Sequence, residues 1–334
     1  MTTAGVQPHF LIPAEALSGL GSYATSLGPL SVLGTDPLAP EVVVKLNEAG
    51  VLGADAGLTP EFAPLLQVLA EPRGVSQVQV TGGGSLVEFT AYASSGSTVS
   101  SVATPDGLSL TAPAQVDEAV QIVGEHVGFS MLASLALSIR LEPAEAVAFA
   151  AMVDHYRRRD LTALLDGGSA SSTTDLGAVR QLLTVTDARW LVPLVGAVAG
   201  IDASEGSEAV GLLTSELDRA ASQIATRFPL FDRVLAVTTA VAPDNGAPVG
   251  SQVMIIQGGV HDMLIIEAGE DGVGIVTLPP AMVLARISAI LHDPGGDLAG
   301  MAANKANQPT FCPACGTEFL PEGQYCTKCG AKRP

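Results

Sequence analysis

Apolar residues recur at intervals of three and four along several parts of this chain, which is the pattern of amphipathic helices. The clearest apolar face lies within residues 208–228 and consists of Val210, Leu213, Leu217, Ala221 and Ile224. The same periodicity predicts further helices over residues 40–52, 60–70, 142–165 and 281–291. Thr59 precedes Pro60, an order typical of an N-cap followed by the first turn of a helix.

Shorter apolar runs predict β-strands in two groups. The first group covers residues 78–80, 86–93 and 97–104, and the second covers 234–241, 252–257, 263–268 and 273–278. Within 87–92, the residues Val87, Phe89 and Ala91 alternate with Glu88, Thr90 and Tyr92, which indicates one buried face. Because the strands are grouped and do not alternate with helices, we expect an α+β fold of antiparallel sheets with helices packed on one side.

The two groups of strands end in similar ways. Asp106-Gly107 and Asp271-Gly272 lie 165 residues apart, and each pair is followed by an apolar run, by proline and by a helical pattern. These helical patterns end at His126 and His292, which lie 166 residues apart. Asp-Gly is a hairpin signal, and proline suits the first turn of a helix. The repeated order predicts two similar halves, although such turns are common enough for a chance alignment to be the alternative.

Composition and charge narrow the class of protein. The 334 residues are 47% hydrophobic and 15% charged, which excludes wholesale disorder, and the net charge is −18. An acidic surface repels phosphate backbones, so nucleic acid is not an expected partner of the body. We see no secretory signal and no run of about 20 apolar residues that could cross a membrane. All four cysteines lie at position 312 or later. The expected location is therefore the cytoplasm, a reducing compartment.

The cysteines form the one motif that carries specific chemistry. Their spacing is C-x2-C-x10-C-x2-C, and two such turns can close a tetrahedral four-sulfur site. The segment resembles the zinc-ribbon family over residues 311–333 only. The resemblance implies one structural Zn²⁺ held by Cys312, Cys315, Cys326 and Cys329. A rubredoxin-like iron site and a redox CxxC pair are the alternatives that we weigh.

Two stretches rich in Gly and small polar residues separate these parts of the chain. The predicted division is a first α+β half (1–165), a linker (166–175), a second α+β half (176–292), a flexible linker (293–310) and the zinc ribbon (311–334). The ribbon lacks a basic stripe, so we expect it to contact protein.

The remaining polar groups give weaker signals. His261-Asp262 could supply a base and its orienting carboxylate, but adjacent strand residues point to opposite faces. Asp154-His155 and the following residues 157–160 form the only basic cluster of the body, which we interpret as a solvated helix face. No catalytic constellation is favoured over a structural interpretation.

The layout of the body resembles the type VII (ESX) secretion-associated chaperone family. The resemblance rests on KLNEAGVLGADAGLTPEF (45–62), LLQVLAEP (65–72) and DGLSL (106–110). It implies an α+β protein with two pseudo-symmetric halves that binds secreted partner proteins without catalysis; the zinc ribbon departs from the family plan. We therefore expect a non-enzymatic, cytosolic adaptor, chaperone or scaffold with a protein partner. The alternatives are an enzyme with a pocket near His261-Asp262 and a nucleic-acid-associated regulator acting through the ribbon. The oligomeric state is not predicted.

Overall fold

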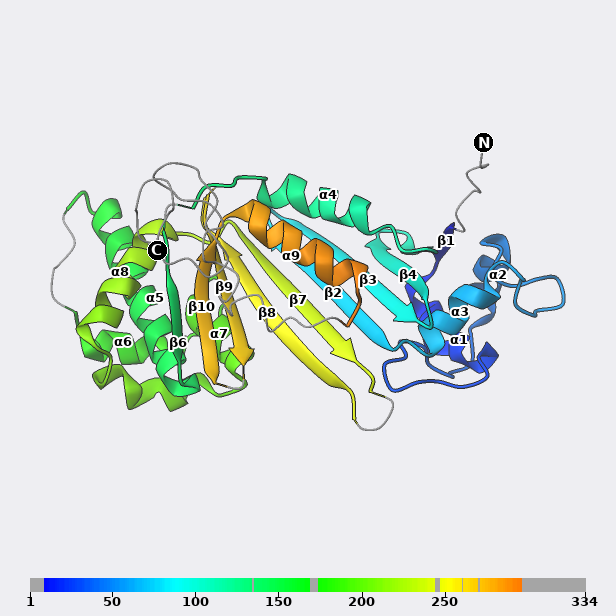
Figure 1. Cartoon of the computed structure of the whole chain (residues 1–334), viewed down its shortest axis with the longest axis horizontal. Coiled ribbons are helices and arrows are strands. Elements are labelled where there is room, and N and C mark those ends of the chain that lie inside the picture. Colours follow the sequence, from blue (N-terminus) through cyan, green and yellow to red (C-terminus); the bar gives the residue numbers. More distant parts are fainter. Residues whose placement is uncertain are drawn as a thin grey trace, which may run out of the picture.

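A computed structural model describes residues 9–133, 135–168, 174–243, 247–259, 261–269 and 271–295. These residues form helices around one ten-stranded antiparallel sheet with the order β1-β5-β4-β3-β2-β7-β8-β9-β10-β6 (Figure 1). No helix in the described residues is long and apolar enough to span a membrane. The four cysteines lie outside the described residues, and so does most of the predicted linker before them.

The elements of the first half follow one another from His9 to Val127. They are β1 (His9–Ile12), α1 (Leu17–Leu20), α2 (Pro40–Glu48), α3 (Ala63–Ala70), β2 (Gly74–Gly82), β3 (Ser85–Ser94), β4 (Ser97–Thr104), β5 (Gly107–Thr111) and α4 (Val116–Val127).

The second half repeats this plan with longer helices. Its elements are β6 (Ser138–Leu141), α5 (Pro143–Leu165), α6 (Leu176–Leu182), α7 (Leu191–Ala199), α8 (Ser215–Arg227), β7 (Arg233–Val241), β8 (Val249–Gln257), β9 (Met263–Gly269), β10 (Gly272–Leu278) and α9 (Pro280–His292).

Each half has the same strand order, but the two sheets are not separate. The order β1-β5-β4-β3-β2 in the first half corresponds to β6-β10-β9-β8-β7 in the second. Strands β2 and β7 pair along nine residues, from Gly74↔Val241 to Gly82↔Arg233. The two halves therefore share one sheet, which corrects the expectation of one sheet per half. The pairing satisfies the backbone groups of two strand edges that would otherwise be open to other chains.

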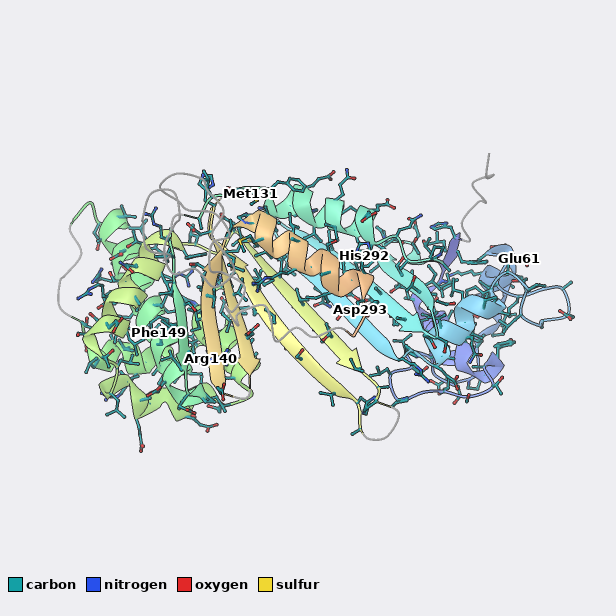
Figure 2. The ribbon with its side chains drawn as sticks, viewed as in Figure 1. Glu61, Met131, Arg140, Phe149, His292 and Asp293 are labelled. Carbon is teal, nitrogen blue, oxygen red and sulfur yellow. The ribbon has the colours of Figure 1, made fainter. Side chains whose placement is uncertain are left out.

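Helices cover both faces of the sheet, which corrects the expectation of helices on one side. On one face, α4 and α9 pack over β2, β3 and β7–β10 around Phe89, Leu235 and Ile265. On the opposite face, helices α5–α8 bury Phe149 and lie over the second half (Figure 2). Helices α1–α3 lie over the first half on that face, where α3 packs on β3 and β4.

A glycine lies in each half at the point where the short edge strand, β1 or β6, pairs with its neighbour, β5 or β10. Gly107 and Gly272 open β5 and β10 with φ of +142° and +104°. A Cβ atom at Gly107 would lie 2.2 Å from the carbonyl oxygen of Ile12, and one at Gly272 would lie 2.4 Å from that of Leu141. The two Asp-Gly signals therefore mark equivalent places, where the backbone of β1 or β6 approaches too closely for a side chain.

Two predicted helices begin later than expected. The helix predicted over 60–70 begins at Ala63, because the Thr59 hydroxyl donates to the carbonyl oxygen of Gly50 (2.7 Å) and does not cap the helix. The helix predicted over 208–228 begins at Ser215, because the Thr214 hydroxyl accepts from the Leu217 N–H (3.3 Å) and caps it there.

Candidate functional site

Among the described residues, no helix covers the centre of one sheet face, between the two groups of helices. In Figure 1, the α5–α8 group and the α1–α3 group lie at opposite ends of the sheet, with the central strands between them. Helix α3 packs on β3 and β4, and α7 packs on β8, β9 and β10. The cross-strand rows that join these groups are Glu88–Gln79–Ala236–Met254, Thr90–Gln77–Thr238–Gln252 and Tyr92–Val75–Ala240–Gly250.

These rows are buried only where a helix group covers them, and the residues between the two groups are half-buried or exposed. Met254 is buried among the α5–α8 group, and Tyr92 is buried among the α1–α3 group. Between them lies a polar surface, which we call the central floor and define as Gln77, Gln79, Glu88, Thr238 and Gln252. Gln252 is exposed and the other four are half-buried.

A hydrogen-bonded ladder organises this floor. The amides of Gln77 and Gln79 donate to the two carboxylate oxygens of Glu88, at 3.0 and 2.8 Å. Leu86, on the same face of β3 as Glu88, is 64% exposed and supplies an apolar end to the floor. The alternation of Val78 and Val80 with Gln77 and Gln79 is a strand signal that a wider reading of this segment could have detected, since our prediction covered only 78–80.

His261 and Asp262, the residues of the alternative enzyme hypothesis, both bind a connecting segment. The ring nitrogen Nδ1 of His261 lies 2.9 Å from the hydroxyl of Ser130, and a carboxylate oxygen of Asp262 accepts from the Leu135 N–H at 3.1 Å. Ser130 and Leu135 belong to the connection between α4 and β6. Asp262 is only 3% exposed, whereas His261 is exposed. Both side chains therefore have a structural role in holding this connection to the start of β9.

The basic cluster contains a buried ion pair, which corrects the interpretation of a solvated face. The guanidinium Nη1 of Arg157 donates to Oδ1 of Asp154 at 2.7 Å, and both side chains are buried. The other oxygen, Oδ2, accepts from the N–H groups of Leu191 (2.7 Å) and Val192 (3.0 Å) at the start of α7. Burial raises the pKa of Asp154 to about 6, against the lowering by Arg157 and these N–H donors.

Arg157 also lies in a cage of backbone and aromatic groups. It donates from Nε to the carbonyl oxygen of Pro229 (3.3 Å) and from Nη2 to that of Arg189 (3.2 Å). Its guanidinium carbon lies 3.8 Å from the ring centre of Phe231 and 5.5 Å from that of Trp190. Burial lowers the pKa of Arg157, with Asp154 opposing that shift. The pair joins α5 to α7 and to the segment before β7, so it holds together the helices beside the central floor.

The predicted zinc ligands cannot be placed in this geometry. Cys312, Cys315, Cys326 and Cys329 lie outside the described residues, so the zinc site stays a prediction. Among the described residues, no group of three or more His, Cys, Asp or Glu side chains could hold a metal ion.

Comparisons with known proteins give likenesses among solved structures. No protein-family model matches the chain, and no curated protein matches it. The fold is similar to the type VII secretion system chaperone EspG5 of Mycobacterium tuberculosis, solved in complex with a PE25–PPE41 dimer. The match has 11% identity and a TM-score of 0.48, and it covers 86% of this chain and 97% of that chain. A likeness at this level carries no argument about function.

Proposed function

We propose that this chain is a non-catalytic, cytosolic adaptor or chaperone that binds a helical segment of a partner protein on the central floor. The observation that supports this proposal is that the described helices cover both ends of one sheet face and leave its centre uncovered. The C-terminal ribbon, with one structural Zn²⁺ on its four cysteines, belongs to the same proposal as a second protein-contacting module.

The spacing of the flanking helices favours a single helix as the occupant. Helix α3 lies over β3 and β4, and α7 is centred on β9, so four to five strand spacings separate them. Strands lie about 4.8 Å apart, which places the two helices about 20 Å apart. Helices that pack side by side are about 8–10 Å apart. The interval therefore accommodates one more helix between α3 and α7.

The chemistry of the floor favours a reversible association. Its side chains are amides and a hydroxyl, and the one carboxylate, Glu88, is already paired with Gln77 and Gln79. Interfaces of non-obligate complexes are about as polar as the rest of a protein surface, whereas permanent interfaces are more apolar. A net charge of −18 would steer the chain away from acidic partners and towards neutral or basic ones.

The test compares substitutions on the floor with matched substitutions elsewhere. Gln252→Arg and Thr238→Arg place a long, charged side chain on the floor. Gln121→Arg and Thr226→Arg make the same changes at exposed positions of α4 and α8. Each full-length variant is used to capture partners from the native cytosol, and the captured proteins are quantified against wild type by mass spectrometry.

The proposal expects one partner at near-stoichiometric yield with wild type and both control variants, and its loss with both floor variants. Hydrogen exchange of the purified complex should then be slowed in β2, β7 and β8. Equal capture by floor and control variants would overturn the proposal. Higher capture by a chain ending at Gly295 than by the full-length chain would show that residues 296–334 compete with the partner for the floor. That result would also overturn the proposal that the floor is available to a partner in the full-length chain.

A further inference from the structure

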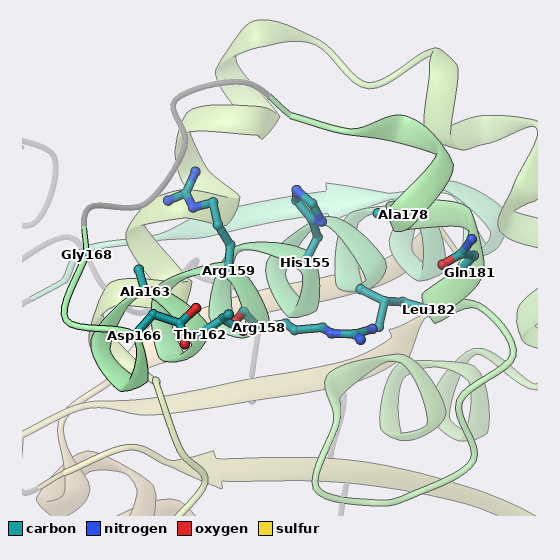
Figure 3. Close-up of a pocket in the computed structure, with 10 residues that line it drawn as sticks. All are labelled: His155, Arg158, Arg159, Thr162, Ala163, Asp166, Gly168, Ala178, Gln181 and Leu182. Atoms are coloured by element: carbon teal, nitrogen blue, oxygen red, sulfur yellow. The ribbon is translucent and has the colours of Figure 1, made fainter.

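A cavity of about 440 Å³ lies between α5 and α6, away from the central floor (Figure 3). Polar side chains from both helices line it, including His155, Arg158, Arg159, Thr162 and Gln181. Its volume falls in the range of small-molecule sites. In Figure 3, His155 and Arg159 project to the same side of α5, and Gln181 comes from α6. We infer that this cavity binds the oxyanion of a small phosphorylated molecule.

The first observation is the concentration of cationic groups in an acidic chain. The sequence has 16 Lys and Arg against 34 Asp and Glu, yet two consecutive arginines line this one cavity. Arg159 is engaged, since it pairs with Asp160 at 2.7 Å and stacks over the ring of Tyr156 at 4.6 Å. Arg158 is exposed, and its guanidinium has no ion pair among the described residues. It is therefore the cation available to a ligand.

The second observation is a buried polar atom without a partner. The ring nitrogen Nε2 of His155 is buried and makes no hydrogen bond with the described residues. A buried polar atom that lacks a partner costs free energy, and a small rotation of this ring, which lines the cavity, would bring Nε2 to a ligand oxygen and remove that cost. Arg158, His155 and the amide of Gln181 thus offer donors of the kind that bind phosphate oxygens.

Acidic groups at the same cavity restrict the class of ligand. Asp166 lines the cavity, so its carboxylate would partly repel an anion that has no hydrogen-bond donors. A phosphate monoester with hydroxyl groups can instead donate a hydrogen bond to this carboxylate while its phosphate faces Arg158. Ribose 5-phosphate has both features and is the probe of choice, and inorganic sulfate is the matched probe without hydroxyl groups on a carbon skeleton.

Protonation of His155 adds a second readout. Burial lowers its pKa, Arg159 and Arg158 lower it further, and Asp175 and Asp160 oppose them. Without a ligand, these effects favour the neutral form of the His155 ring, whereas a bound anion would favour the protonated form. Sulfate does not titrate between pH 6 and pH 8, so its affinity should rise as the pH falls in wild type and not in His155→Gln.

Isothermal titration calorimetry on the full chain tests this inference. Ribose 5-phosphate should bind wild type more tightly than sulfate, and Arg158→Gln should weaken both probes about tenfold, as expected for a charge-assisted hydrogen bond. Arg227→Gln removes the same charge from an exposed position on α8 and should change neither affinity. No saturable heat with wild type, or equal losses in the two arginine variants, would overturn the inference.

Discussion

Replacing Arg157 by methionine should make the stability of this protein unusually sensitive to pH. Methionine keeps an apolar side chain beside Phe231 but removes the cation from Asp154. The carboxylate would then be buried with two backbone donors, the N–H groups of Leu191 and Val192, and no counterion. Burial already raises the pKa of Asp154 to about 6 in the presence of Arg157, which lowers it. Without the guanidinium, the pKa of this carboxyl must rise further.

The sign and size of the effect follow from proton linkage. A group whose pKa is raised on folding stabilises the fold fully below its unfolded value, and this contribution is lost as the pH rises through the folded value. In wild type the loss is complete soon after pH 6. In Arg157→Met it continues to higher pH, and each unit of pKa corresponds to about 1.4 kcal/mol. Between pH 6 and pH 8, the variant should lose about 2–3 kcal/mol relative to wild type.

The total cost of the substitution should show the same trend. At pH 8, breaking a buried ion pair from one side costs about 3–5 kcal/mol. At pH 5, Asp154 is protonated in the variant, and the remaining cost of about 1–2 kcal/mol reflects the lost hydrogen bonds to Pro229 and Arg189.

Urea denaturation between pH 5 and pH 8 measures these differences. The fluorescence of Trp190, the single tryptophan, reports on this part of the structure because its ring lies 5.5 Å from the guanidinium of Arg157. The double variant Asp154→Asn/Arg157→Met removes the titrating group, so it should recover the loss at pH 8 and show no excess pH dependence. Asp187→Asn breaks an exposed ion pair and should change little at any pH.

A penalty for Arg157→Met that is the same at pH 6 and pH 8 would refute this reasoning. Failure of the double variant to recover stability at pH 8 would refute it as well, because the cost would then not lie in the unpaired carboxylate.

Three further outcomes can be measured on the same protein. Gly107→Ala and Gly272→Ala should each lower the free energy of unfolding by about 1–3 kcal/mol, because the new Cβ meets a carbonyl oxygen, whereas Gly168→Ala enters open space and should be neutral in the same denaturation assay. Mass spectrometry should find one zinc ion per chain, and Cys326→Ser should abolish it; a zinc-free wild type would remove the ribbon from the proposal. Deleting residues 307–334 should leave thermal unfolding of the body nearly unchanged, and a large fall in its midpoint would mean that the tail packs on the body.

The sequence was most informative where the signal is local. The strand predicted over 97–104 has those bounds in the structure, and the long helix predicted from residue 142 begins one residue later. Proline at the first helical position and a capping box between Glu142 and Glu145 fix that start locally. The edge strand β1 was missed because four residues without their partner strand give almost no periodic signal.

Features that depend on distant segments could not be predicted. Arg157 lies in a run of charged residues that reads as a surface, and it is buried by groups from residues 189 and 229. The union of the two halves depends on pairing between β2 and β7, which are more than 150 residues apart. The described helices leave the central floor uncovered because α3 lies over β3 and β4 and α7 lies over β8, β9 and β10, and neither helix carries a sequence signal for its position over the sheet.

The pairing of β2 with β7 has a further consequence for how a partner can be held. Antiparallel pairing of equivalent strands is what a two-fold axis produces in a homodimer, so the chain has the geometry of a symmetric dimer joined into one polypeptide. A true dimer would present identical walls on either side of the junction, and an asymmetric ligand could enter it in two opposite directions with equal affinity. Here one wall consists of the short helices α1–α3 and the other of the larger α5–α8 group. Because both halves belong to one chain, the two helix groups can differ in sequence and size. The surface between them can therefore distinguish the two ends of a bound segment.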